Sequence, residues 1–462
     1  MCGICGAYYF GGDPTNLVYY MQYTLQHRGQ ESFGIAATDG RKIVVTKKEG
    51  LVSTFTENDH KKLLRNGNFT PTIAVGHNRY SNTGGDDIEN YQPFIVQTKF
   101  GKIALCHNGN IPDTSSMKKI LDKKNYGLDG DSDSEMIAQM IAYCSYGDSV
   151  QSIEEAIQMA LKTVKGAYSI IIMTTDSLIG LRDPWGIRPL SLARINGSGF
   201  AFSSETSATE TIDAEWICDL AAGEMIIIDK DGNINQIKMF DQVSENLCIF
   251  EHIYFAAPAS VIHERYLKTA RRHMGERLYA EHPVEIFNKS EWIVGGVPDT
   301  GLPAAQGYAE ASGLEYRDLF QRNRAIGRTF IQPEQRLREL GVRLKLLPYS
   351  REIRGKKVVV VEDSIVRGTT MVQLVALLRS AGAAEVHVRI SSPPYRYKCL
   401  LGTDTQRTKE LIASENSVEE IRQRIGADSL GYLSLEGLIK AINPVPGYGF
   451  CTGCFDQNYP EM

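Results

Sequence analysis

Residues 358–370, VVVVEDSIVRGTT, restrict the possible folds of this chain more than any other stretch. Four consecutive valines predict a strand that is buried on both faces, as in the centre of a parallel sheet. Glu362 and Asp363 follow at its carboxyl end, where open α/β sheets bind their ligands. Residues 364–370 then supply small and hydroxyl side chains before a predicted helix, whose free N–H groups suit a phosphate. An acidic pair before a capped helix is equally typical of a solvated surface, so the pair alone does not decide the function.

The surrounding pattern predicts two domains, as expected for a chain of 462 residues. After about residue 260, strand-like stretches alternate with helix-like ones, which is typical of an α/β domain. One of these helices follows the glycine at 368 and is predicted to end at Ala381-Gly382. The first half has many short strands, Gly-rich turns and two helices, so we expect an α+β domain there. The second of those helices, at 152–164, opens with Ser152 and Glu155 in a capping-box pattern.

The composition excludes several kinds of partner. A formal net charge of −5 gives no electrostatic reason to expect nucleic acid or an anionic membrane. No apolar run reaches the length of a membrane span, and no ATP-type P-loop sequence, G-x-x-x-x-G-K-S/T, occurs. Nine cysteines in a chain without a recognisable leader favour reduced thiols in the cytoplasm, used for metal binding or catalysis.

Residues 358–370 as a whole resemble the signature of type I phosphoribosyltransferases, which bind phosphoribosyl pyrophosphate (PRPP). Two further stretches fit the resemblance: GVPDTGLPAA at 296–305, and the basic loop RNRAIGRTFIQPEQ at 322–335. The resemblance implies that Mg²⁺ is bound by Thr300, Glu362 and Asp363. It also implies that PRPP is bound by Asp299, Arg322, Arg328, Glu362, Asp363, Ser364, Arg367, Gly368, Thr369 and Thr370.

The N-terminus, MCGICGAYYF, contains a C-x-x-C motif that is poorly explained as a redox pair. A thioredoxin-type motif lies between a strand and a helix, whereas this one runs into the strand-like AYYF. If Met1 is removed, Cys2 gains a free α-amino group, which can act as the general base that generates the thiolate. An enzyme of this kind also needs an oxyanion hole and groups that bind the charged ends of an amino acid.

Candidates for these roles lie downstream in three short motifs. HNRYSNTGG contains Arg79, CHNGN contains Asn108 and Gly109, and GDSDSE contains Asp133. Individually, each is equally typical of a surface salt bridge, a turn or a helix cap.

Together with MCGICG, LQHRGQES, GAYSI and RDPWGIRPL, these motifs resemble the N-terminal-nucleophile glutamine amidotransferases. The resemblance implies an αββα sandwich in which Cys2 is the nucleophile that releases ammonia from glutamine. Asn108 and Gly109 would then form the oxyanion hole. Arg79 and Asp133 would bind the ends of glutamine, and Arg28 would be a further glutamine-binding residue.

A glutaminase of this type followed by a PRPP-binding domain resembles the family of glutamine-dependent PRPP amidotransferases. We place the glutaminase domain at 2–243, a linker at 244–260, the type I phosphoribosyltransferase domain at 261–445 and a C-terminal tail at 446–462. The family reaction converts PRPP, glutamine and water into 5-phosphoribosylamine, pyrophosphate and glutamate, the first step of purine synthesis, with ammonia passing internally to C1 of PRPP. The family also implies a homo-oligomer, expected to be a tetramer, and feedback inhibition by purine nucleotides.

A second C-x-x-C, at Cys451 and Cys454, calls for a separate explanation. Four thiolates suit either zinc or an iron–sulfur cluster. One branch of the family carries a 4Fe–4S cluster, and the matching positions here are Cys248, Cys399, Cys451 and Cys454. The remaining cysteines are predicted to be small core residues; they are Cys5, Cys106, Cys144 and Cys218.

The chain departs from the family pattern at six positions. Thr300 and Glu362 replace serine and aspartate and keep the ligand chemistry. The other four are Arg322 for lysine, Ala325 for tyrosine, Ala257 for arginine and Ala259 for aspartate. Because the interdomain segment lacks two charges, we predict weaker activation of glutamine hydrolysis by PRPP. Two alternatives remain at this stage: a PRPP-sensing regulator without turnover, and a zinc- or redox-regulated amidotransferase with another acceptor.

Overall fold

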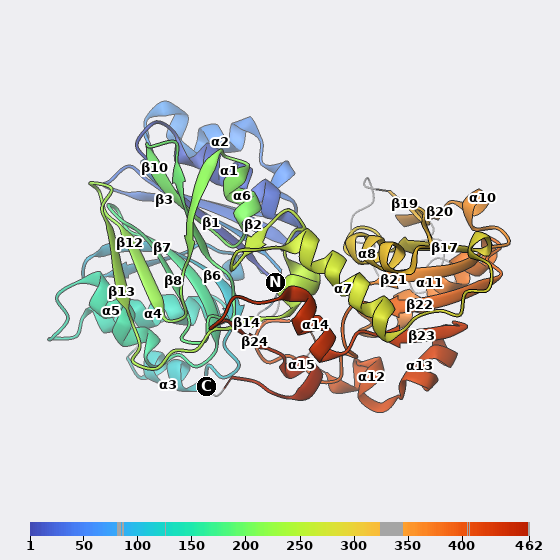
Figure 1. The fold of residues 1–462 in the computed structure, drawn as a ribbon. Coiled ribbons are helices and arrows are strands. Elements are labelled where there is room, and N and C mark those ends of the chain that lie inside the picture. Colours follow the sequence, from blue (N-terminus) through green and yellow to red (C-terminus); the bar gives the residue numbers. More distant parts are fainter. Residues whose placement is uncertain are drawn as a thin grey trace.

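The computed structural model describes residues 1–80, 85, 87–124, 126–323, 345–403, 405 and 407–460. Two domains lie side by side, and the N-terminus lies between them (Figure 1). The predicted PRPP-binding residue Arg328 and the departure at Ala325 fall outside the described residues. None of the described helices combines the length and apolar composition needed to cross a membrane.

The N-terminal domain consists of two antiparallel sheets packed face to face. The first sheet has the order β11-β9-β10-β1-β4-β2-β3, and the second has the order β13-β12-β8-β7-β6-β5. The strands of the first sheet are β1 (Gly3–Tyr9), β2 (Ser32–Thr38), β3 (Ile43–Glu49), β4 (Ile73–Arg79), β9 (Ser191–Ile195), β10 (Gly199–Ser203) and β11 (Ala214–Asp219). Those of the second are β5 (Phe94–Thr98), β6 (Gly101–Asn110), β7 (Ala167–Met173), β8 (Leu178–Arg182), β12 (Glu224–Ile228) and β13 (Ile234–Lys238).

Helices cover the outer face of each sheet, so the predicted αββα sandwich is confirmed. In β1, Ile4 packs between the sheets while Cys5 packs toward α1, as alternation along a strand requires. Cys5 is therefore a fully buried core residue. The helices on the first sheet are α1 (Pro14–Thr24), α2 (Glu57–Leu63) and α6 (Thr206–Glu210). Those on the second are α3 (Ser115–Lys123), α4 (Asp133–Ser145) and α5 (Ile153–Leu161).

The predicted capping box of α5 is only half formed. Ser152 Oγ accepts a hydrogen bond from the Glu155 N–H at 3.3 Å, as expected of an N-cap. The Glu155 carboxylate, however, accepts from the Gln151 N–H at 2.7 Å instead of from Ser152. The prediction of a reciprocal bond from the Ser152 N–H to Glu155 is therefore wrong, because the Gln151 N–H occupies the Glu155 carboxylate instead.

The C-terminal domain is built on a parallel sheet with the order β18-β17-β21-β22-β23. Its strands are β17 (Trp292–Gly296), β18 (Glu315–Tyr316), β21 (Lys357–Glu362), β22 (Glu385–Ile390) and β23 (Ser429–Tyr432). The four valines lie in the central strand β21 and are fully buried, as predicted. The described helices of this domain are α7 (Leu267–Glu281), α8 (Leu302–Ser312), α10 (Ser350–Ile353), α11 (Thr369–Ser380), α12 (Ile412–Glu415), α13 (Val418–Ile425) and α14 (Leu435–Ile442). Two short strands, β19 (Phe320–Arg322) and β20 (Leu346–Pro348), form an antiparallel pair beside the sheet.

The interdomain segment and the C-terminal tail lie together between the two domains (Figure 1). Strand β14 (Asn246–Cys248) pairs in parallel with β24 (Gly449–Cys451). A π-helix, η5 (Glu251–Phe255), follows β14, and the short pair β15 (Val261–Ile262) and β16 (Arg265–Tyr266) leads into α7. Helix α15 (Gly453–Asp456) follows β24. The domain limits placed at 243, 260 and 445 stay predictions.

Candidate active sites

Cys2 lies immediately before β1, at the wall of a small cavity between the two sheets. Its Sγ is 3.6 Å from the carbonyl oxygen of Tyr80. The cavity is also lined by Arg79 from β4, Gly109 from β6 and Asp133 from α4, so the fold brings three predicted glutamine-site residues to the predicted nucleophile. Burial raises the pKa of the Cys2 thiol, so a base is needed to form its thiolate.

The amide of Asn108 lies directly beside Cys2. Its Oδ1 accepts a hydrogen bond from the Cys2 N–H at 3.3 Å, while its Nδ2 is buried without a hydrogen-bond partner. A buried donor with no partner is costly unless something else uses it, and an oxyanion hole requires such a donor next to the nucleophile. Gly109 follows, and a Cβ there would lie 1.9 Å from the Ala167 carbonyl oxygen. Only glycine therefore fits at this position.

The two predicted end-binding residues are held by the ends of their elements. Asp133 is the first residue of α4, and its Oδ2 accepts from the Ile111 N–H, just after β6, at 2.9 Å. Arg79 ends β4; its guanidinium donates to the Gly85 carbonyl at 2.8 Å and lies 5.7 Å from the ring centre of Tyr91. An aspartate and an arginine thus line one cavity with Cys2, as binding of an α-ammonium and a carboxylate requires.

His107 also lines this cavity, although the sequence reasoning did not select it. Its Nδ1 lies 2.8 Å from Ser134 Oγ and 3.9 Å from Asp133 Oδ1. Burial lowers the pKa of His107, which favours a neutral ring. The position of His107 next to Asn108 in CHNGN could have indicated that it belongs to the site. Only the register of β6, however, shows which side chains of this strand face the cavity.

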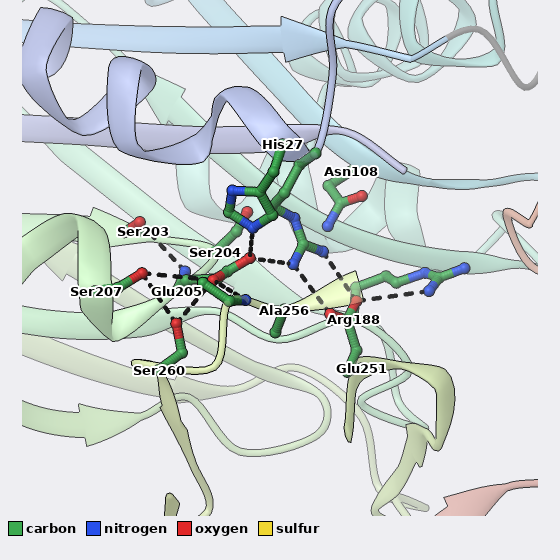
Figure 2. A network of polar contacts seen from close by, with 12 residues as sticks. His27, Asn108, Arg188, Ser203, Ser204, Glu205, Ser207, Glu251, Ala256 and Ser260 are labelled. Carbon is green, nitrogen blue, oxygen red and sulfur yellow. Dashed lines mark hydrogen bonds and ion pairs between the residues drawn. The ribbon is translucent and has the colours of Figure 1, made fainter. Parts of the chain in front are cut away.

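Arg28 occupies a different place from the predicted one. It follows the 3₁₀-helix η1 (Leu25–His27), is fully buried and does not line the cavity. Its Nε donates to the Cys2 carbonyl at 3.0 Å, and its other two nitrogens pair with Glu205 at 2.7 Å and Glu251 at 2.9 Å (Figure 2). All three nitrogens are committed to the protein. In this structure Arg28 holds the backbone carbonyl of Cys2, the predicted nucleophile.

The second candidate site lies at the carboxyl edge of the parallel sheet. The loops after β17 and β21 meet there, because Thr300 Oγ1 donates to Asp363 Oδ2. Ser364 Oγ donates to the other carboxylate oxygen of Asp363 at 2.6 Å. Burial, followed by the charge of Asp363, raises the pKa of Glu362 well above its ordinary value. Two acids and a hydroxyl therefore share one edge, a suitable donor set for Mg²⁺.

The other described residues that are predicted to bind PRPP lie around the same edge of the sheet. Gly368 has φ of +80° and caps α11, which places Thr369 and Thr370 at the helix N-terminus. Arg322 pairs with Asp299, and Arg367 pairs with Glu410 at 2.7 Å. Both arginines would exchange these carboxylate partners for phosphate oxygens if they bind PRPP.

The four cysteines predicted to hold a cluster gather where the tail meets the interdomain segment. Cys248 lies opposite Cys451 in the β14–β24 pair, and Cys454 follows in α15. Cys399 packs against the same apolar cluster of side chains. Burial first, and then the neighbouring thiols, raise the pKa of Cys454. Within the described ranges, no group of three or more His, Cys, Asp or Glu side chains is arranged to hold a metal ion.

These two sites, on an αββα domain and a parallel-sheet domain, define a glutamine amidotransferase joined to a phosphoribosyltransferase. Residues 77–211 match the family described as "Glutamine amidotransferase domain", and residues 266–392 match "Phosphoribosyl transferase domain". Amidophosphoribosyltransferase from Synechococcus elongatus is 42% identical, with 99% of this chain and 91% of that protein covered. The enzyme from Bacillus subtilis is 40% identical, with 99% and 94% covered.

Solved structures are also similar over the whole chain. The PRPP amidotransferase of B. subtilis, solved with ADP and GMP, has a TM-score of 0.90 at 39% identity, with 100% of this chain and 98% of that chain covered. The chain belongs to the amidophosphoribosyltransferase family, glutamine-dependent enzymes of purine biosynthesis that transfer the amide nitrogen to PRPP.

Proposed function

We propose that Cys2, once Met1 is removed, attacks the amide carbon of glutamine in the cavity beside β6. The negative charge that develops on the amide oxygen is stabilised by Asn108 Nδ2 and the backbone N–H of Gly109. Arg79 binds the α-carboxylate and Asp133 the α-ammonium of the substrate. The observation that carries this proposal is the buried, unpartnered Nδ2 of Asn108 on the same amide that contacts the Cys2 N–H.

The base for this step is the α-amino group of Cys2 itself. An amine can take the thiol proton only when it is neutral, and desolvation favours the neutral form. Burial lowers the pKa of the α-amino group of Met1, one residue away, to about 5. Burial would in the same way favour the neutral form of the α-amino group that Cys2 gains when Met1 is removed, which is the form that can take the proton of the thiol.

Ammonia released at Cys2 then reaches C1 of PRPP in the second domain, and pyrophosphate leaves. The sum of the reaction is PRPP, glutamine and water to 5-phosphoribosylamine, pyrophosphate and glutamate. The position of the N-terminus between the domains supports an internal transfer (Figure 1). Thr300, Glu362 and Asp363 would hold Mg²⁺, which neutralises charge on the pyrophosphate when bound.

The cysteines Cys248, Cys399, Cys451 and Cys454 would hold a 4Fe–4S cluster that ties the tail to the interdomain segment. Their common apolar surroundings support a structural group. The colour of the purified protein distinguishes iron from zinc. An iron–sulfur cluster gives a brown colour that Cys454→Ser removes, whereas stoichiometric zinc in a colourless protein would refute the cluster.

A homo-tetramer, a cytoplasmic location and feedback inhibition by purine nucleotides complete the proposal. The nucleotides bound to the B. subtilis relative support the inhibition.

One assay tests this function: glutamate formation with and without PRPP and Mg²⁺, on protein whose N-terminal residue is verified as Cys2. We expect glutamate and phosphoribosylamine to form in equal amounts when all components are present. Glutamine hydrolysis without phosphoribosylamine would refute coupled transfer. The absence of both activities would instead favour a PRPP-sensing protein.

A further inference from the structure

A network of buried polar side chains lies behind the carboxylate of Asp133. Its members are Gln92, His107, Ser134 and Asp133 itself, and none of them is more than 6% exposed. Gln92 lies just before β5, His107 lies in β6, and Ser134 is the second residue of α4. All four line the cavity that contains Cys2, so the network belongs to the wall of the proposed glutamine site.

The hydroxyl of Ser134 is the centre of this network. Its Oγ lies 3.1 Å from Gln92 Nε2, 2.8 Å from His107 Nδ1 and 3.1 Å from Asp133 Oδ1. A hydroxyl has one hydrogen to donate and two lone pairs that can accept. Three neighbours therefore use its whole bonding capacity, and none remains for a substrate.

The direction of each hydrogen bond follows from the Gln92 amide. Its Oε1 accepts from the His107 N–H at 2.7 Å, so its Nε2 faces Ser134 and donates to it. An ionised carboxylate can only accept. The single hydrogen of Ser134 therefore goes to Asp133, because the opposite arrangement would direct a hydroxyl lone pair at a negative charge 3.1 Å away.

The same count of donors fixes the tautomer of His107. Since the hydrogen of Ser134 goes to Asp133, Ser134 Oγ can only accept from the imidazole, and the hydrogen of the neutral ring lies on Nδ1. Burial supports the neutral ring, because it lowers the pKa of His107. The ring is then held through Nδ1, since Nε2, 3.4 Å from the Ala167 carbonyl oxygen, has no hydrogen to donate.

Both oxygens of the Asp133 carboxylate are held as a result. Oδ1 accepts from Ser134 at 3.1 Å, and Oδ2 accepts from the Ile111 N–H at 2.9 Å. Each oxygen keeps a further lone pair that can accept from a substrate. The carboxylate cannot turn without breaking a buried hydrogen bond and leaving its donor unpaired, which is costly.

We propose that Ser134 is a positioning residue that fixes the Asp133 carboxylate for the α-ammonium of glutamine. Gln92 and His107 assist by holding the Ser134 hydroxyl in the direction of Asp133. The network therefore selects amides that carry an α-ammonium group over amides that lack one. This inference rests on the proposed role of Asp133 in binding glutamine.

The test uses two amides that differ only in the α-ammonium: glutamine and the monoamide of glutaric acid. Ser134→Ala and His107→Phe are compared with Ser145→Ala, a matched control. Ser145 is the last residue of α4, is fully buried, and donates to the Ala142 carbonyl at 2.6 Å. It thus resembles Ser134 in burial and bonding but lies at the other end of the helix. The kcat and KM of each full-length enzyme are measured for both amides with PRPP and Mg²⁺ present.

The two amides should respond differently to the loss of the hydroxyl. We expect Ser134→Ala to lose at least about tenfold in kcat/KM for glutamine, as for loss of a hydrogen bond to a charged group. Most of this loss should be a rise in KM, because the ammonium is bound equally in the ground and transition states. The kcat/KM for the monoamide should be unchanged, because it has no ammonium for Asp133 to bind. His107→Phe keeps the hydroxyl and should lose less in the same direction, and Ser145→Ala should keep the parental preference for glutamine.

Three results would overturn the inference: an unchanged kcat/KM for glutamine in Ser134→Ala, an equal loss with both amides, or the same loss of preference in Ser145→Ala. If Ser134→Ala does not fold, Ser134→Cys is judged by the same criteria, because a thiol is only a weak donor. If the parent does not hydrolyse the monoamide, the inhibition constants of glutamate and glutarate replace the two kcat/KM values, since these differ by the same ammonium group.

Asp133→Asn separates this inference from the proposed function. A parental preference for glutamine in Asp133→Asn would refute the assignment of Asp133 to the α-ammonium. A loss of preference in Asp133→Asn without one in Ser134→Ala would refute the positioning role of Ser134 alone.

Discussion

Replacing Asn108 tests whether its unpaired amide nitrogen is the oxyanion donor. In the folded enzyme Oδ1 accepts from the Cys2 N–H at 3.3 Å, and Nδ2 has no partner. Asn108→Ala removes both groups. Asn108→Asp keeps an acceptor of the same shape but lacks the donor, so the two variants separate the roles of the two atoms.

The expected magnitudes follow from these contacts. Removing one oxyanion donor costs about 2.7–4 kcal/mol in the transition state, which is roughly a 10²–10³-fold loss of kcat. Stability should respond differently. Losing the bond to the Cys2 N–H costs about 0.5–1.5 kcal/mol, but removing a buried unpaired donor recovers about 1–3 kcal/mol. The Tm of Asn108→Ala should therefore remain close to that of the parent or rise.

The assay is the steady-state rate of glutamate formation, with ammonia-dependent amination of PRPP as the control. Both variants should lose the first activity by at least about 10²-fold. The second should be unchanged, because it does not pass through the oxyanion. A loss of less than about tenfold in Asn108→Asp would refute the reasoning, as would parallel losses of both activities.

Three further changes have defined outcomes. Gly109→Ala should lower both Tm and glutaminase activity, since its Cβ would lie 1.9 Å from the Ala167 oxygen; a calorimetric scan equal to that of the parent would contradict this. Thr300→Val removes the hydroxyl that donates to Asp363. Because a hydrogen bond to a charged group is worth about 1.5–3 kcal/mol, the PRPP concentration for half-saturation should rise by about tenfold or more. An unchanged half-saturation concentration in the ammonia-dependent assay would exclude a role for Thr300. Burial opposes charge on His27, but Glu205 raises its pKa overall. The pair therefore stabilises the fold fully below about pH 6.5, and the stabilisation is lost as pH rises through the raised pKa. The Tm deficit of His27→Gln should accordingly be largest in acid and shrink in base; a deficit independent of pH would contradict the pairing.

Much of the fold follows from local pattern in the sequence. The four valines become the central strand β21, and α11 ends at Ser380, just before the predicted Ala381-Gly382 stop. Such elements can be predicted because burial of one stripe of a helix leaves a periodic apolar pattern, and burial of both faces of a strand leaves a continuous apolar run. Capping is less certain: the carboxylate of Glu155 bonds a neighbouring N–H, a choice that depends on the local path of the chain.

The support of the site could not be predicted in the same way. Arg28 was expected to bind glutamine because it lies in a recognisable motif, yet its partners Glu205 and Glu251 lie 177 and 223 residues away. Nothing in the spacing of these residues indicates that they meet. Buried ion pairs of this kind arise from tertiary packing, which a single sequence does not display.

The central claim is that Cys2 releases the nitrogen that the second domain transfers. Cys2→Ser, in protein whose N-terminus is verified, tests it most directly when glutamine- and ammonia-dependent phosphoribosylamine formation are measured side by side. We predict a loss of at least about 10³-fold in the glutamine-dependent rate, as for removal of a nucleophile, with the ammonia-dependent rate retained. A variant that still uses glutamine at the parental rate would contradict the account, and so would one that loses both activities while remaining folded.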